Sequence, residues 1–153
     1  MLKIKIVAIG KMRKNDPLGD VYCDYIKRLP WDISLVELEE KRSLPEEKLK
    51  EKESQLLCSA ISADSKLILL DEHGKDCNSK NFAKILKNWS DDGCNNISIA
   101  IGGAYGLGEE IKNRADIRLS FGKMTWPHMM VRAMLSEQLY RAHTIITNHP
   151  YHK

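Results

Sequence analysis

IAIGGAYGLGEEI, residues 99–111, has the pattern of a buried strand, a glycine-rich turn and the start of a helix. In open α/β sheets, ligands bind just beyond the carboxyl ends of parallel strands, which is where such a turn lies. Glycines also allow a ligand to approach the backbone closely. The pattern therefore predicts a binding site, although a tight turn without a ligand explains the Gly102–Gly103 pair equally well.

The spacing of the glycines narrows the class of ligand. Gly103 and Gly108 have the spacing of a phosphate-binding P-loop, but Glu109 and Glu110 follow them instead of Lys and Ser or Thr. The G-x-G-x-x-G fingerprint of dinucleotide-binding proteins is also absent. An enzyme of phosphorylated nucleotides is therefore disfavoured. A neutral or cationic nucleoside without phosphates fits better, and S-adenosylmethionine is such a ligand.

Two further segments are rich in aromatic and polar side chains. LSFGKMTWPHMMVR, residues 119–132, predicts a loop that precedes a long helix and lies beside the glycine turn. Its apolar side chains form either a wall for an adenine or part of the hydrophobic core. The end of the chain, NHPYHK at residues 148–153, contains Tyr and His side chains that can stack on RNA bases.

Alternating apolar residues at 2–9 and 32–39, and short apolar runs at 67–70 and 97–101, predict strands, and a fifth strand is expected near 117–121. Helices with apolar residues three or four apart separate them. The predicted helices cover residues 18–29, 45–62, 78–89, 109–115 and 127–146. This alternation is typical of an α/β domain with a mainly parallel sheet and helices on both faces. We expect residues 1–153 to form one domain, since no linker interrupts them.

The composition is that of an ordinary globular protein, with 42% apolar and 29% charged residues. No apolar run reaches the roughly 18–20 residues that a membrane helix needs. The beginning of the chain, MLKIKIVAIG, lacks the layout of a secretion signal. We therefore expect a cytoplasmic protein without a membrane partner. Its four cysteines are scattered singly, without the paired spacing of structural zinc ligands, so no metal site is predicted.

Positive charge is concentrated in the last third of the chain. The whole chain carries a formal charge of +3, but residues 111–153 contain seven basic and two acidic side chains. A basic end is compatible with a polyanionic partner such as RNA, and equally with an ordinary solvated surface. A module that binds RNA or a nucleoside without performing chemistry therefore stays open.

Several motifs taken together resemble one family, the ribosomal RNA large subunit methyltransferase H family of the SPOUT (trefoil-knotted) methyltransferases. The resemblance extends over essentially the whole chain. The motifs that carry it are the Gly-Gly-x-x-Gly turn at 102–106, LLDEHGK at 69–75, FGKMTWPH at 121–128, EQLYRA at 137–142 and NHPYHK at 148–153.

This resemblance implies a parallel α/β domain whose carboxyl-terminal part forms a deep trefoil knot. It implies a homodimer with the last helix at the interface. The implied reaction transfers a methyl group from S-adenosylmethionine to N3 of a pseudouridine in large-subunit ribosomal RNA. The implied partner is the assembled ribosome rather than free RNA.

The resemblance also implies which residues form the site. The expected cofactor-binding residues come from three strand ends: Leu70, Gly102, Gly103, Phe121, Gly122, Lys123, Met124, Thr125 and Trp126. The expected catalytic residues, which would hold the base and ease loss of its proton, are Arg141, Tyr151 and His152. For Arg141 the residues alone offer a second interpretation, an ion pair with Glu137 one helical turn earlier.

Overall fold

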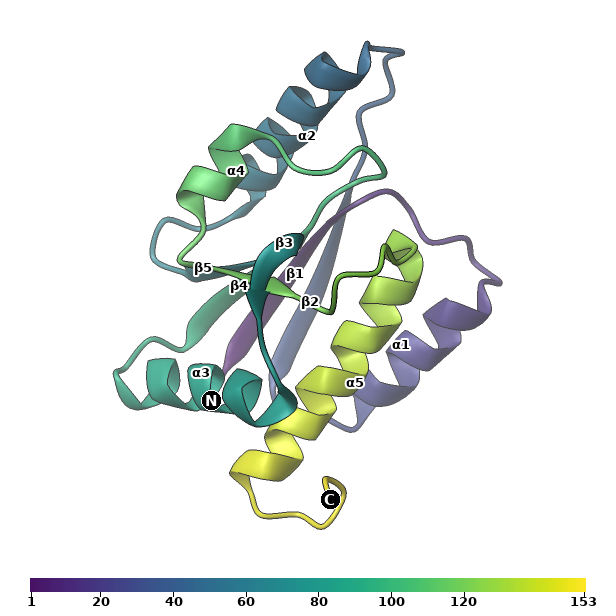
Figure 1. Cartoon of the computed structure of the whole chain (residues 1–153). Coiled ribbons are helices and arrows are strands. Elements are labelled where there is room, and N and C mark those ends of the chain that lie inside the picture. Colours follow the sequence, from purple (N-terminus) through teal and green to yellow (C-terminus); the bar gives the residue numbers. More distant parts are fainter.

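A computed structural model describes all 153 residues and contains five strands and five helices (Figure 1). The strands are β1 (Lys3–Ile9), β2 (Asp32–Leu38), β3 (Lys66–Asp76), β4 (Asn96–Ile101) and β5 (Ile117–Ser120). The helices are α1 (Pro17–Lys27), α2 (Glu46–Ala60), α3 (Ser79–Asp91), α4 (Glu109–Arg114) and α5 (His128–Ile146). None of the helices is long and apolar enough to cross a membrane.

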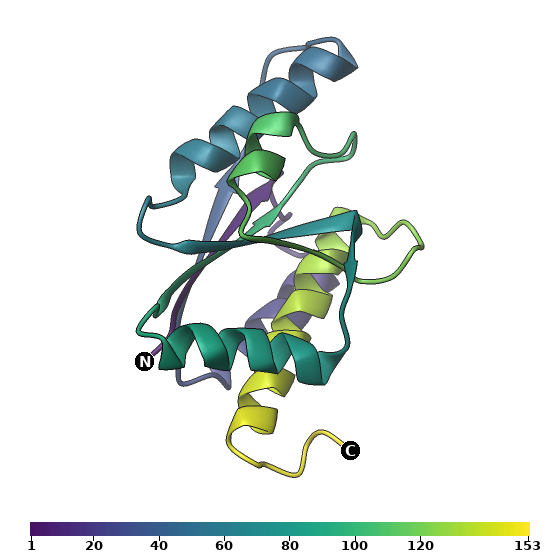
Figure 2. The same cartoon turned by 60° about the vertical axis from the view of Figure 1, so that its left-hand side comes forward.

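The five strands form a single parallel sheet in the order β2-β1-β4-β3-β5. Helices α1, α3 and α5 cover one face, and α2 and α4 cover the other (Figure 2). The α/β class and the mainly parallel sheet with helices on both faces are therefore confirmed. The trefoil knot stays a prediction.

Two hydrophobic clusters hold the layers together, one on each face of the sheet. Alternate residues of β1 enter different clusters: Ile4 and Ile6 pack with α1, α3 and α5, whereas Val7 and Ile9 pack with α2 and α4. Strands that are apolar on both faces are expected in a parallel sheet that helices cover twice. The core thus fixes the sheet and leaves its carboxyl-terminal edge free for a site.

Strand β3 is longer than the sequence predicts. It continues to Asp76, and its pairing with β5 shifts register between Leu70 and Lys75. A Cβ atom at Gly74 would lie 2.9 Å from backbone atoms of Arg118 and Asp71, so only glycine fits this close approach. The residues of β3 after Leu70 are mostly polar, so a search for apolar runs does not predict this part of the strand.

A buried ion pair ties α5 to the ends of β1 and β2. The Arg132 side chain is fully buried, and its Nη1 donates to Glu37 Oε2 at 2.5 Å. Its Nη2 donates to the carbonyl oxygens of Ile9 and Gly10, at 3.3 and 2.8 Å. The contacts fix the start of α5 against the same edge of the sheet that carries the glycine turn.

Glu37→Gln should destabilise the fold by about 3 kcal/mol, because it leaves the buried Arg132 charge without its partner. Burial opposes ionisation of Glu37, but hydrogen bonds from the Met12 N–H and from Arg132 lower its pKa overall. The pair's contribution is therefore present above the ordinary carboxyl pKa of about 4.3 and is lost as pH falls through the lowered value.

Urea unfolding of both proteins between pH 7 and pH 3 checks this prediction. The difference in free energy of unfolding should shrink as the medium becomes acidic. Glu47→Gln, at a side chain that is 86% exposed, is the control and should change little. Equal stability of wild type and Glu37→Gln at pH 7 would contradict the account.

Candidate functional site at the carboxyl ends of three strands

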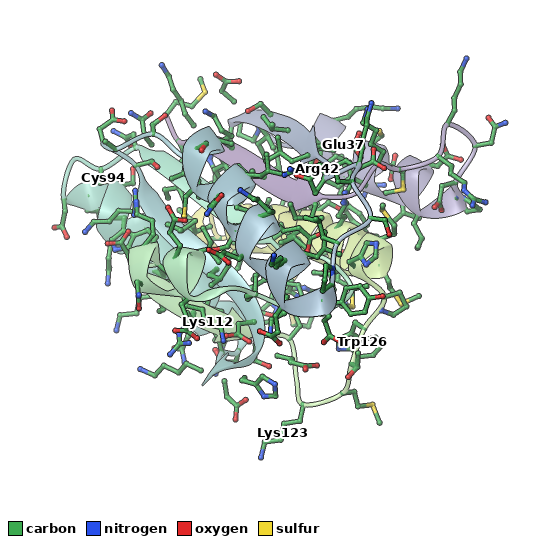
Figure 3. All side chains as sticks on the ribbon, turned by 90° about the horizontal axis from the view of Figure 1, so that it is seen from above. Glu37, Arg42, Cys94, Lys112, Lys123 and Trp126 are labelled. Carbon is green, nitrogen blue, oxygen red and sulfur yellow. The ribbon has the colours of Figure 1, made fainter.

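A cavity of about 730 Å³ opens where β3, β4 and β5 end. Eight of the nine expected cofactor-binding residues line it: Leu70, Gly102, Gly103, Phe121, Gly122, Met124, Thr125 and Trp126. Lys123 is the exception. It is exposed and extends away from the body of the protein, whereas Lys112 and Trp126 lie along the cavity (Figure 3). A hydrated ammonium group is more stable in water than against an apolar wall.

The glycine turn forms one side of this cavity and is tightly packed. Gly103 and Gly106 form an antiparallel bridge, in which the Gly106 N–H donates to the Gly103 carbonyl at 3.2 Å. A Cβ at Gly102 would lie 2.6 Å from Leu107 Cδ2, and one at Gly103 would lie 2.8 Å from Glu53 Oε1. A side chain at either glycine would therefore displace a neighbouring side chain. The two glycines present backbone to the cavity, beside the side chains of Tyr105 and Leu107.

Two carboxylates of β3, directly after Leu70, also line the cavity. Asp71 is buried, and its Oδ2 has no hydrogen-bond partner; the nearest cation, Arg118 Nη1, is 3.8 Å away. Glu72 Oε2 accepts a hydrogen bond from Thr125 Oγ1 at 3.1 Å. This contact connects β3 to the loop before α5, so two of the three strand ends are joined across the cavity.

Exposed apolar side chains surround the mouth of the cavity. Tyr105, Met124 and Trp126 are 54%, 73% and 39% exposed, and all three line it. Large apolar groups left in water next to a cavity indicate that something covers them in the functional state. A flat aromatic base and a second protein chain are both chemically suitable.

The three expected catalytic residues lie together, at the other end of α5. Arg141 Nη1 donates to His152 Nδ1 at 3.1 Å, and the guanidinium carbon lies 4.9 Å from the centroid of the Tyr151 ring. Arg141 also forms the ion pair with Glu137, at 2.6 Å. Since a guanidinium only donates, His152 Nδ1 accepts, and the ring carries its proton on Nε2.

Tyr151 is held as a neutral phenol. Its hydroxyl donates to Glu137 Oε1 at 3.1 Å and lies 3.5 Å from the Tyr25 hydroxyl. The contact with Tyr25, burial and the Glu137 carboxylate together raise the Tyr151 pKa far above its usual range. The hydrogen bond with Glu137 likewise keeps the Arg141 pKa above its ordinary value, against the effect of burial. The cluster therefore offers cationic and neutral donors, and Tyr151 is unsuited to act as a base.

Within one chain, this cluster lies far from the cavity. Val131 is the last residue of α5 that lines the cavity, and Arg141 is 10 residues further along the same helix. At about 1.5 Å per residue, the separation along the helix is roughly 15 Å. The two groups of expected residues therefore do not form one site in a single chain.

Sequence reasoning missed several members of both groups. In the cluster, Tyr140 packs edge-on against Tyr151, and Tyr25 comes from α1 more than 100 residues earlier. No local pattern connects them. At the cavity, Asp71 and Glu72 directly follow a buried apolar strand, and this position alone would have marked them as candidates.

Essentially the whole chain is similar to known proteins. Residues 2–152 match a family model described as "Predicted SPOUT methyltransferase". The chain is 47% identical over 152 residues to the ribosomal RNA large subunit methyltransferase H of Paramagnetospirillum magneticum and 43% identical over 152 residues to that of Rhodospirillum centenum. It is 42% identical over 160 residues to the protein of that name from Rhizobium etli. Each match covers 99% of both chains.

Proposed function

Because the chain belongs to the ribosomal RNA large subunit methyltransferase H family, within the SPOUT methyltransferases, we propose that it methylates N3 of a pseudouridine in large-subunit ribosomal RNA, with S-adenosylmethionine as donor. The observation that carries the proposal is the cavity at the ends of three parallel strands, in a chain that matches methyltransferases over its full length. Open α/β sheets bind their ligands at this edge.

The cavity fits an adenosyl donor in size and chemistry. Its volume of about 730 Å³ lies within the range of small-molecule sites. Leu70, Ile101 and Phe121 supply an apolar lining for a base, and Gly102 and Gly103 supply backbone groups. The carboxylates of Asp71 and Glu72 suit the positive sulfonium, and Lys50 and Lys112 lie in the same lining.

The donor supplies an electrophilic methyl group on a positively charged sulfur. The protein's part is to hold the target base in line with that group, and such positioning accounts for much of the rate in two-substrate reactions. Methylation at N3 requires loss of the N3 proton, which leaves negative charge on the neighbouring carbonyl oxygens. Arg141 and the Nε2–H of His152 would stabilise that charge by donating to it. Solvent water or hydroxide would accept that proton, and the acidity of the N3–H itself would favour its loss.

The cluster formed by Arg141, Tyr151 and His152 can lie next to the cavity only if it comes from a second subunit. We therefore propose a homodimer in which α5 of each subunit lies antiparallel to that of its partner, so that each cluster closes the partner's cavity. The exposed Tyr105, Met124 and Trp126 would be covered in this arrangement by the partner and the RNA. We propose the assembled ribosome in the cytoplasm as the substrate.

Isothermal titration calorimetry with four compounds tests the proposed cofactor. S-adenosylmethionine and S-adenosylhomocysteine should bind saturably. ATP and NAD should not bind, because the glycine turn lacks the P-loop lysine and the dinucleotide fingerprint. Binding of ATP or NAD with affinity equal to that of S-adenosylmethionine would overturn the assignment. RNA binding without affinity for either adenosyl compound would favour a docking module.

A further inference from the structure

Glu53 is a buried carboxyl group without a partner. It lies on α2 behind the glycine turn and is only 8% exposed. Its Oε1 has no hydrogen-bond donor within reach. Burial raises the pKa of this carboxyl group, because no neighbouring cation compensates for lost hydration. An unpaired buried carboxyl group is costly to the fold, so its presence requires an explanation.

The position of Glu53 connects it to the site already described. Both carboxylate oxygens lie next to Gly103, at 2.8 and 3.0 Å from the place that a Cβ would occupy. Glu53 lines a second cavity, of about 370 Å³, on the α2 side of the turn. Gly103, Ala104, Tyr105 and His128 line both cavities, so the two meet at the glycine turn.

The charges around the second cavity favour a cation. Its acidic lining residues are Glu39, Glu40 and Glu53, and its basic residues are Arg42 and His128. Arg42 is already paired with Glu40, at 2.9 Å. Glu39 is largely exposed to water, which leaves Glu53 as the buried, unpaired carboxyl group of this cavity. No group of three or more potential metal ligands is present, so an organic cation is the better occupant.

We propose that Glu53 binds the α-ammonium group of the donor's amino-acid part, with the adenosyl part in the larger cavity. The inference rests on the proposed function, since it concerns the same donor. An ammonium group has three donors and a positive charge, and both properties match a carboxylate that lacks donors and a countercharge. Glu53 would thereby set the direction in which the donor's flexible end leaves the glycine turn. Substitution at Gly103 would disturb both cavities together.

Binding of three related compounds to wild type and Glu53→Gln separates the possible roles of this residue. S-adenosylmethionine has both the ammonium and the sulfonium, S-adenosylhomocysteine has the ammonium only, and 5′-methylthioadenosine has neither. Glu53→Gln should lower the affinity for the first two compounds by roughly 10- to 100-fold, as expected for the loss of a hydrogen bond to a charged group. The affinity for 5′-methylthioadenosine should stay unchanged. Calorimetry gives the three dissociation constants. For a compound that binds too weakly to be titrated directly, the constant is obtained from its displacement of bound S-adenosylhomocysteine.

Each other outcome overturns the inference in a distinct way. An equal loss of affinity for all three compounds would show that Glu53 only supports the structure of the glycine turn. A loss of affinity for S-adenosylmethionine alone would place the carboxylate at the sulfonium. Unchanged affinities would leave Glu53 without a role in binding. A wild-type protein that binds none of the compounds would instead contradict the proposed function itself.

Two controls keep the comparison sound. Glu40→Gln removes an acidic side chain from the same cavity, but one already paired with Arg42, and should leave all three affinities unchanged. The thermal unfolding midpoint of ligand-free Glu53→Gln should be equal to or above that of wild type, because an unpaired buried carboxyl group has been removed. Should this variant fold only in part, the ratio of the S-adenosylhomocysteine and 5′-methylthioadenosine affinities still tests the inference, because unfolding affects both equally.

Discussion

Gly103→Phe should abolish binding of S-adenosylmethionine, with a loss of affinity of at least about 100-fold. Even a Cβ atom at this position would lie 2.8 Å from Glu53 Oε1 and 3.1 Å from Ile9 Cγ2. A phenyl ring cannot fit there unless the turn moves away from α2 and into the cavity. Calorimetric titration of wild type and variant with the donor measures the effect.

The matched control for this variant is Gly19→Ala on α1. Its new Cβ would meet only the flexible Met12 side chain, at 3.3 Å, and Gly19 is absent from the lining of both cavities. The control should bind the donor as wild type does. A Gly103→Phe protein that is folded, by circular dichroism, and retains wild-type affinity would show that the donor does not bind at this turn.

Arg141→Ala should lower the rate of methyl transfer at saturating donor by about 100-fold or more, while donor affinity stays unchanged. The reason is that Arg141 lies roughly 15 Å along α5 from the cavity of its own chain. It would act on the target base through the partner subunit. Lys87→Ala, which removes a comparable one-turn ion pair with Asp91 on α3, is the control and should keep full activity.

Mixed dimers distinguish action within a subunit from action across the interface. When Gly103→Phe and Arg141→Ala subunits are mixed, half of the dimers are hybrids, and each hybrid has one site with an intact cavity and an intact partner cluster. Activity should therefore recover to about a quarter of the wild-type value, as expected for a two-fold symmetric dimer. A mixture that stays as inactive as its two components would show that the cluster serves its own subunit or no site.

The order of elements was predictable because each strand and helix carries its own periodicity. β1 begins by alternating lysine with isoleucine, β4 is a short and mostly apolar run, and a glycine follows each strand. α5 shows apolar residues at Val131, Leu135 and Leu139. The extension of β3 to Asp76 was not predictable in this way. Its residues after Leu70 are polar, and only the register shift against β5 brings them back into the sheet.

The site was predictable to the extent that its residues follow strand ends. The glycine turn and the loop at 121–126 stand directly after β4 and β5 in the sequence, and both line the cavity apart from Lys123. Glu53 could not be predicted, because it reaches the turn from the middle of a helix whose pattern is otherwise polar. Its contact with the turn depends on how α2 packs on the sheet. The sequence of α2 alone does not indicate that packing.

Ribosomes from a strain that lacks the endogenous methyltransferase test the central claim most directly. They are incubated with the purified protein and S-adenosylmethionine that carries an isotopically labelled methyl group, and the large-subunit RNA is then digested to nucleosides for mass spectrometry. We predict one labelled product, N3-methylpseudouridine, that is missing when Gly103→Phe replaces the wild-type protein. Unlabelled RNA, or a label on a different nucleoside, would contradict the account.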